Sequence, residues 1–187
     1  MPSTYFSNPL TFLIDTLFGL YMGIVALRLI MQWAQWEYHN PLVQIIIKST
    51  QIPVKFLRQF IPAIGKWDSA TFVLLFILTA IKLSLLLLLQ HAVLSYSLIQ
   101  FVIADIFSLF ITLFSASIII QVILSWIQPH NSPNPITPLI SRMNAPILRP
   151  IRQLLPVMSG LDLSPFVALI GLQLLSMLVL PLLTMAF

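Results

Sequence analysis

A short phrase that contains one arginine and one aspartate occurs twice in the chain. The two copies are LRQFIPAIGKWD at residues 57–68 and IRQLLPVMSGLD at residues 151–162. Arg58 and Arg152 are separated by the same interval as Asp68 and Asp162, since 152 − 58 and 162 − 68 both equal 94. A guanidinium binds phosphate through charged hydrogen bonds, so the arginines could contact a lipid headgroup or a protein partner. The constant interval predicts two copies of one structural unit.

Proline and glycine in the phrase predict how the chain turns. Pro62 recurs as Pro156, whereas Gly65 is replaced by Ser159, with Gly160 directly after it. Proline ends or kinks a helix, and glycine permits the backbone conformations of a tight turn. We expect each copy to be a hinge at which one helix ends and the chain re-enters the membrane, with the aspartate starting the next helix.

Positive charge surrounds both copies and indicates binding of anionic lipid and a protein partner. The basic residues are Lys48, Lys55 and Arg58 before and at the start of the first copy, and Arg142, Arg149 and Arg152 before and at the start of the second. Polar side chains leading into the first copy are spaced by 4, 3, 4 and 3 residues, which places them on one face of a helix. They are Gln44, Lys48, Gln51, Lys55 and Arg58. Such a helix lies in the membrane interface. We expect interfacial segments at 41–62 and 136–156, broken or kinked at their prolines, and the prolines of 128–138 to exclude a regular helix there.

The composition places the chain in a membrane. Of its 187 residues, 59% are hydrophobic and only 7% are charged. A soluble domain carries roughly 25% charged residues, so this chain could not cover a water-exposed surface with ionic groups. Cysteine is absent, which excludes disulfides, thiolate nucleophiles and cysteine-based metal sites. We expect an all-α integral membrane protein.

Four apolar stretches are long enough to cross the hydrocarbon core, which takes about 20 residues. They cover residues 10–33, 69–89, 98–126 and 166–183. The interfacial segments fall between the first and second span and between the third and fourth. The chain therefore divides into a first repeat at 1–97 and a second at 98–187, each with the order span, amphipathic helix, span.

Lysine and arginine predict the orientation of these spans. Between spans, they occur in the connections 34–68 and 127–164. The positive-inside rule therefore places both amphipathic segments in the cytoplasm and both termini outside. Both repeats then run in the same direction, as parallel repeats do. Four tryptophans fall at the predicted cytoplasmic boundary, as in an aromatic belt: Trp33, Trp36, Trp67 and Trp126.

Charged residues within the spans predict polar contacts inside the membrane. A central lysine in a membrane helix costs about 2.5–3.5 kcal/mol on a translocon scale, so Lys82 requires a partner or a path to water. Asp15 and Asp105 are candidate counter-ions in the same outer half, and the alternative is that Lys82 snorkels outward to water. Arg28 is close to the end of its span, and we expect it to snorkel to the interface.

Gly19 and Gly23 form a GxxxG pair in the first span. Glycines at this spacing let a second helix approach closely. The pair favours packing against a neighbouring span of the same chain, and the alternative is dimerisation through this face.

Catalytic motifs do not occur in the sequence. It has no glycine-rich phosphate loop, HExxH motif, nucleophile elbow or carboxylate cluster, and its three histidines are scattered. The formal net charge of +4 is concentrated between spans, which indicates anionic lipid and not nucleic acid. We therefore predict a protein that is not an enzyme and has no metal site or cofactor.

The repeated motif resembles the YggT family. The resemblance rests on the Asn-Pro pair at 40–41, the stretch 48–51, the sequence RPIRQLLP at 149–156 and the Pro-x-x-Gly and Asp ahead of a span, and it covers nearly the whole chain. It implies a multi-pass protein of the bacterial inner membrane. Bacterial members are linked to osmotic-stress tolerance, and relatives in other bacteria and plastids to cell division, nucleoid distribution and cytochrome assembly.

Two functions compete on this sequence. The first is a membrane scaffold or assembly factor whose basic interfacial helices bind anionic phospholipid and a membrane protein partner or a second copy. The alternative is a small oligomeric channel or transporter for an ion or osmolyte, lined by Lys82, Asp15 and Asp105. Four spans in one chain leave little room for a pore, so the alternative requires an oligomer.

Overall fold

The structure, a computed structural model, describes the backbone of residues 4–61, 68–89, 98–127, 134–154 and 162–185. These residues form six helices and no strand. The helices are α1 (Thr4–Trp33), α2 (Pro41–Leu57), α3 (Ser69–Leu89), α4 (Leu98–Ile127), α5 (Ile136–Leu154) and α6 (Ser164–Met185). The predicted all-α class is confirmed for the described part of the chain.

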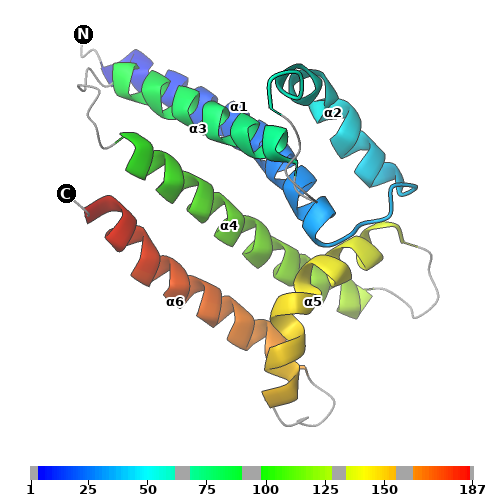
Figure 1. Ribbon diagram of the computed structural model, residues 1–187. Coiled ribbons are helices and arrows are strands. Elements are labelled where there is room, and N and C mark those ends of the chain that lie inside the picture. The colour runs from blue at the N-terminus through cyan, green and yellow to red at the C-terminus, as the bar shows by residue number, and fades with distance from the viewer. Residues whose placement is uncertain (1–3, 62–67, 90–97, 128–133, 155–161, 186–187) are drawn as a thin grey trace.

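Four of these helices, α1, α3, α4 and α6, are long and apolar enough to cross a membrane. Their bounds lie close to the four predicted spans. The shorter α2 and α5 lie beside one end of the long helices, and both chain termini lie at the other end (Figure 1). We call the end beside which α2 and α5 lie the α2/α5 end.

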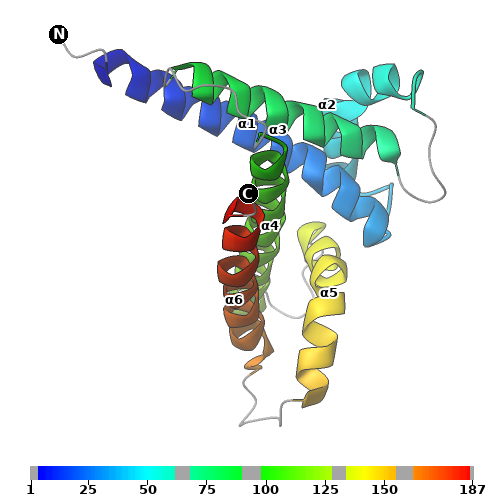
Figure 2. The same ribbon diagram turned by 60° about the vertical axis from the view of Figure 1, so that its left-hand side comes forward.

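The long helices pack as two antiparallel pairs, α1 with α3 and α4 with α6. Contact between α3 and α4 joins the pairs, which diverge from that contact when the molecule is viewed from the side (Figure 2). α2 packs on α1 and α3, and α5 packs on α4 and α6. The main apolar cluster includes Met22, Val25, Leu75 and Val102, so it spans both pairs.

Prolines inside α2 and α5 do not break these helices. α2 continues through Pro53, and α5 continues through Pro146 and Pro150, so the breaks expected in α5 are wrong. A proline leaves one carbonyl of the preceding turn without its backbone donor, and neighbouring side chains can replace that donor. In α2 the freed carbonyl belongs to Ser49, and the Tyr21 hydroxyl of α1 donates to it at 3.5 Å.

The proline-rich stretch before α5 also differs from its prediction. Residues 136–138, which were expected to lie outside any regular helix, form the first turn of α5. A proline is tolerated there because the first amides of a helix have no intrahelical partner.

The glycine pair of α1 does not contact another helix. A methyl group added at Gly19 or Gly23 would meet no atom of a neighbouring element within 4 Å. The expected packing of this face against a span of the same chain is therefore wrong, because α3 approaches α1 along a different face.

Candidate functional site

Arg58 and Asp68 of the first phrase form an ion pair where α3 begins. Arg58 Nη2 donates to Asp68 Oδ2 at 2.6 Å and Nε donates to Oδ1 at 3.3 Å, so the guanidinium contacts both carboxylate oxygens. The Thr71 hydroxyl donates to Oδ2 at 2.7 Å, and the Asp68 amide donates to the side-chain oxygen of Gln32 in α1 at 3.2 Å. The arginine that the sequence offered as a headgroup contact thus fastens the end of α2 to the start of α3.

Arg28 reaches the same carboxylate from α1. Its Nε lies 3.8 Å from Asp68 Oδ2, and its Nη1 donates to the Thr50 hydroxyl of α2 at 2.7 Å. The Arg28 side chain is only 6% exposed, so the expected snorkelling is wrong. Because α2 covers this part of α1, Arg28 finds its partners inside the protein. A single carboxylate therefore ties α1, α2 and α3 together.

The environment of Asp68 keeps it charged. Burial opposes ionisation, but hydrogen bonds from Arg58 and Thr71 and the charges of Arg58 and Arg28 outweigh it and hold the pKa of Asp68 below its ordinary value. The hydrogen bond to Asp68 likewise raises the pKa of Arg58. Opposite charges that stabilise each other in this way are typical of a structural clamp.

The second phrase makes the corresponding ion pair nearer the surface. Arg152 Nη2 lies 2.8 Å from Asp162 Oδ2, and Nε donates to the same oxygen at 2.9 Å. The other oxygen, Oδ1, accepts the amide of Ser164 at 3.0 Å and its hydroxyl at 2.5 Å. Burial raises the pKa of Asp162, but the bonds from Ser164 and the charge of Arg152 outweigh it, so this pKa is also lowered. Both side chains of this pair are nearly half exposed, at 47% and 46%.

Each short helix also has one fully buried polar residue at the same place in its repeat. These are Thr50 in α2 and Asn144 in α5, and 144 − 50 gives the interval of 94. Asn144 accepts from the Ser117 hydroxyl of α4 at 2.5 Å and donates to the side-chain oxygen of Gln121 in α4 at 2.7 Å. In both repeats a polar bond therefore fixes the short helix to the span before it.

The starts of α2 and α5 contact each other. Asn40 accepts the Leu42 amide as the N-cap of α2 and donates to the Pro135 carbonyl at 2.7 Å, just before α5. Arg142 of α5 donates to Glu37 at 2.6 Å and to the carbonyl of Gln35 at 3.0 Å. The two repeats thus meet through polar contacts at the α2/α5 end.

Three of the predicted basic residues remain without a partner in the described part of the chain. Lys48 and Lys55 of α2 and Arg149 of α5 are exposed and make no hydrogen bond or ion pair with a described residue. They differ in this from Arg58, Arg142 and Arg152. The free positive charge of the short helices therefore lies at residues 48, 55 and 149.

Three charged residues of the spans, Lys82, Asp15 and Asp105, lie together. Lys82 Nζ is 2.9 Å from Asp105 Oδ2 of α4 and 3.2 Å from Asp15 Oδ1 of α1. The lysine is 9% exposed, so it pairs with the two candidate counter-ions and does not extend outward to water. Because Asp105 belongs to the second repeat, the cluster joins the two halves near the end that carries the termini.

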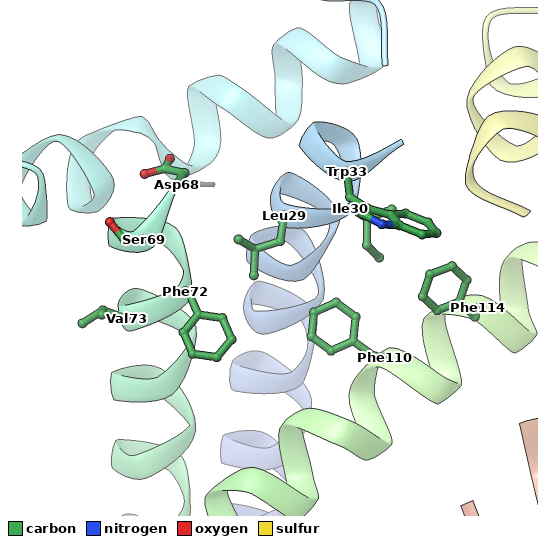
Figure 3. Close-up of a pocket in the computed structure, with 9 residues that line it drawn as sticks. All are labelled: Leu29, Ile30, Trp33, Asp68, Ser69, Phe72, Val73, Phe110 and Phe114. Atoms are coloured by element: carbon green, nitrogen blue, oxygen red, sulfur yellow. The ribbon is translucent and has the colours of Figure 1, made fainter. Parts of the chain in front are cut away.

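Two cavities meet at Trp33, at the end of α1. The first, of about 620 Å³, lies between α1, α3 and α4 and is lined by Leu29, Ile30, Trp33, Asp68, Ser69, Phe72, Val73, Phe110 and Phe114 (Figure 3). The second, of about 830 Å³, lies against α5 and is lined by Trp33, Ala34, Gln35, Arg142, Ala145, Pro146, Arg149, Pro150 and Gln153. The first is apolar except at Asp68 and Ser69, and the second contains two arginines.

Other predicted residues lie outside the described part of the chain. Pro62, Gly65, Pro156 and Gly160, on which the predicted hinge depends, belong to this group, as does Trp67. Trp36 is described, and it is buried in an apolar cluster at 7% exposure instead of facing lipid in a belt.

Several residues of the site were not found from the sequence. Thr50 and Asn144 lie in the short α2 and α5, Thr71 and Gln121 lie in the apolar α3 and α4, and none belongs to the repeated phrase. A signal was present for the first two, because the same interval of 94 places a small polar residue on the apolar side of each short helix.

Comparison with known proteins gives matches over nearly the whole chain. A family model described as CCB3/YggT matches twice, at residues 7–89 and 100–183. The chain is 36% identical over 177 residues to the uncharacterised protein YggT of Escherichia coli K12, which covers 91% of this chain and 88% of that protein.

Two further relatives come from other bacteria. An uncharacterised protein of Vibrio alginolyticus is 35% identical over 173 residues, covering 89% of this chain and 90% of its own length. One from Pseudomonas aeruginosa is 38% identical over 171 residues, covering 90% and 86%. No solved structure matches the chain significantly.

Proposed function

Because this chain belongs to the CCB3/YggT family, as its repeated motif predicted, we propose that it is a non-enzymatic scaffold or assembly factor of the bacterial inner membrane. In this proposal α2 and α5 lie in the cytoplasmic interface, with both termini outside. Their free basic side chains bind anionic phospholipid, and the exposed helix faces bind a membrane protein partner. This activity would underlie the osmotic-stress tolerance and division-related organisation that the family resemblance implies.

The observation that carries the proposal is that some basic residues of the short helices and phrases are paired within the protein and others are not. Arg58 and Arg152 pair with aspartates of their own phrase, which leaves Lys48, Lys55 and Arg149 exposed and without a described partner. A cation near an anionic membrane surface contributes about 1 kcal/mol of attraction, so three unpaired cations at one end of the molecule favour anionic lipid there. They also favour placing that end in the cytoplasm.

Lipid enrichment around the reconstituted protein tests the first part of the proposal. We would measure energy transfer from the tryptophans to a fluorescent phosphatidylglycerol or phosphatidylethanolamine in mixed vesicles of these two lipids. We expect phosphatidylglycerol to be enriched, and the triple variant Lys48→Gln, Lys55→Gln, Arg149→Gln to remove the enrichment while the ion pairs keep the fold. Equal transfer to both lipids in the wild-type protein would contradict the proposal.

Site-specific crosslinking in native membranes tests the partner. A photoreactive residue at Gln51, on the exposed face of α2, is expected to give a discrete protein adduct. The same residue at Leu88, 61% exposed near the other end of α3, is the control and should not. The triple charge variant should weaken the Gln51 adduct. If both positions give the same adducts or none, the partner function of α2 fails.

The alternative function, a small oligomeric channel or transporter, would use the charges inside the spans. Lys82 pairs with Asp105 at 2.9 Å and with Asp15 at 3.2 Å, which favours a role in holding helices together. Solute flux into proteoliposomes decides between the two. Flux above that of empty vesicles, and its loss in Lys82→Met, would support the transporter over the scaffold.

A further inference from the structure

The apolar cavity of Figure 3 is positioned to receive a hydrocarbon chain. The rings of Phe72, from α3, and Phe110, from α4, face the space between the two diverging helix pairs, and Leu29 of α1 forms its floor (Figure 3). Phe72 is 54% exposed, so this space opens sideways between α3 and α4, where lipid surrounds a membrane protein. Its volume of about 620 Å³ is within the roughly 300–1,000 Å³ of pockets that enclose small ligands.

The carboxylate that borders this cavity does not repel an anionic ligand. Asp68 accepts hydrogen bonds from Arg58 and Thr71 and lies 3.8 Å from Arg28, so two positive charges neutralise it. The hydrocarbon-lined space therefore has no uncompensated negative charge at its α2/α5 end.

The second cavity supplies a cation next to this space. Trp33 lines both cavities, and its ring packs edge-on against Phe114, with 6.1 Å between centroids. On the α5 side of Trp33, Arg149 has no partner among the described residues, whereas Arg142 is already paired with Glu37. A free guanidinium and the side chain of Gln153 thus line a polar cavity that shares a wall with an apolar one.

From these observations we infer that the two cavities form one binding site for a single anionic phospholipid, with an acyl chain between α3 and α4 and the phosphate at Arg149. The inference deepens the proposed function, on which it rests, by assigning one lipid molecule to a place between the repeats. Charge complementarity selects this occupant, because a neighbouring membrane helix would fill the apolar space but bring no anion to Arg149. A free phosphate would bind the guanidinium but leave the aromatic space empty.

Quenching of Trp33 by brominated lipid tests the site. A protein with Trp36→Phe, Trp67→Phe and Trp126→Phe retains Trp33 as its one tryptophan. It is reconstituted with phosphatidylglycerol or phosphatidylcholine brominated on the acyl chains, at equal mole fractions. We expect stronger quenching by the brominated phosphatidylglycerol. Arg149→Gln should raise the mole fraction needed for half-maximal quenching roughly tenfold, as loss of a charged hydrogen bond does.

Matched variants separate the site from general surface attraction. Val73→Phe fills the cavity from α3 and should abolish the excess quenching, whereas Ile77→Phe, one turn along α3 and outside the lining, should not. A second measurement uses the protein with all its tryptophans: phosphatidylglycerol that copurifies in detergent should fall in Val73→Phe and not in Ile77→Phe.

The outcomes distinguish this inference from the proposed function. If both brominated lipids quench Trp33 equally while energy transfer still shows phosphatidylglycerol around the protein, the site is wrong and the proposed function stands. The same holds if Arg149→Gln lowers the quenching but Val73→Phe leaves it unchanged. If phosphatidylglycerol is not enriched in either assay, both are wrong.

Discussion

The two halves of the chain carry the same arginine and aspartate at the same interval, but they bury the aspartate to different depths. Both arginines are about half exposed, at 50% and 47%. Asp68 is 4% exposed and contacts Arg58, Arg28 and Thr71, whereas Asp162 is 46% exposed and contacts Arg152 and Ser164. The difference arises outside the phrase. In the first half a second arginine, Arg28, comes from the preceding span, and residue 122, its counterpart at an interval of 94, is a valine.

This difference shows that one motif can serve two energetic roles. In the first half its aspartate is part of the interior that joins three helices. In the second half it is a partly exposed clamp at the edge of the molecule, and the link between α5 and its span passes through Asn144 instead. The charge left free by these pairs lies on α2 and α5.

The largest expected effect separates the two aspartates. Asp68→Asn leaves Arg28 buried without a counter-charge and should lower the free energy of unfolding by about 3 kcal/mol, as breaking a buried ion pair does. Asp162→Asn removes a half-exposed pair and should cost about 0–1 kcal/mol. Thermal unfolding in detergent, followed by circular dichroism, measures both. Equal losses would show that the depth of the pair does not matter.

The buried polar residues of the short helices come next. Thr50→Val removes the hydroxyl that accepts from Arg28 and should cost about 2 kcal/mol, in the range for hydrogen bonds to charged groups. Asn144→Leu removes two bonds between neutral side chains and should cost about 1 kcal/mol. Chemical denaturation in micelles gives both values. A larger loss for Asn144→Leu would show that the polar contact of the second half contributes more to stability than that of the first.

Lys82 and Ser176 occupy equivalent positions, since 176 − 82 equals 94. Lys82→Met removes two interhelical ion pairs and should destabilise the fold by about 1–2 kcal/mol, because polar contacts between membrane helices are individually modest. Ser176→Ala should have no measurable effect. The same unfolding assay applies. If the free energy of unfolding is unchanged in Lys82→Met, the cluster does not hold the two halves together.

The smallest effect expected near neutrality is the dependence on pH. Both aspartates of the phrases have lowered pKa values, so their stabilisation is fully present above the unfolded pKa of about 3.9 and is lost as the pH falls through the folded pKa. Melting temperature should be flat from pH 7 to about pH 5 and fall below about pH 4. Asp68→Asn should flatten this acid limb more than Asp162→Asn. If both variants still show the full fall of the melting temperature at acid pH, other titrating groups cause it.

Most of the fold could be predicted because membrane spans are long apolar stretches that depend little on tertiary context. The predicted spans and the observed helices start and end within a few residues of one another, apart from the start of α1. Prolines misled the prediction for α5, since Pro146 and Pro150 lie inside a continuous helix. Packing of a short helix against two spans compensates for lost backbone bonds. The rule that proline breaks a helix considers only the local sequence and does not include that packing.

The candidate site could be predicted only in part. The interval of 94 identified Arg58 and Asp68 as members of one repeated motif, but it did not show that they bind each other. Arg28 was expected at the interface because it is close to the end of its span. Its burial depends on how α2 lies over α1, and spacing along the chain does not determine that contact. The partners of Lys82 could be predicted, because charges inside spans have few possible counter-ions.

One paired measurement tests most directly whether clamping and lipid binding belong to different basic residues. Arg58→Gln with Arg152→Gln removes the clamps, and Lys48→Gln with Lys55→Gln and Arg149→Gln removes the free charges. Both proteins are measured for melting temperature in detergent and for phosphatidylglycerol enrichment in vesicles. We predict that the clamp variant melts lower but keeps its lipid enrichment, and that the free-charge variant melts like wild type but loses it. If the clamp variant loses the lipid at an unchanged melting temperature, the repeated arginines bind the lipid and the assignment is wrong.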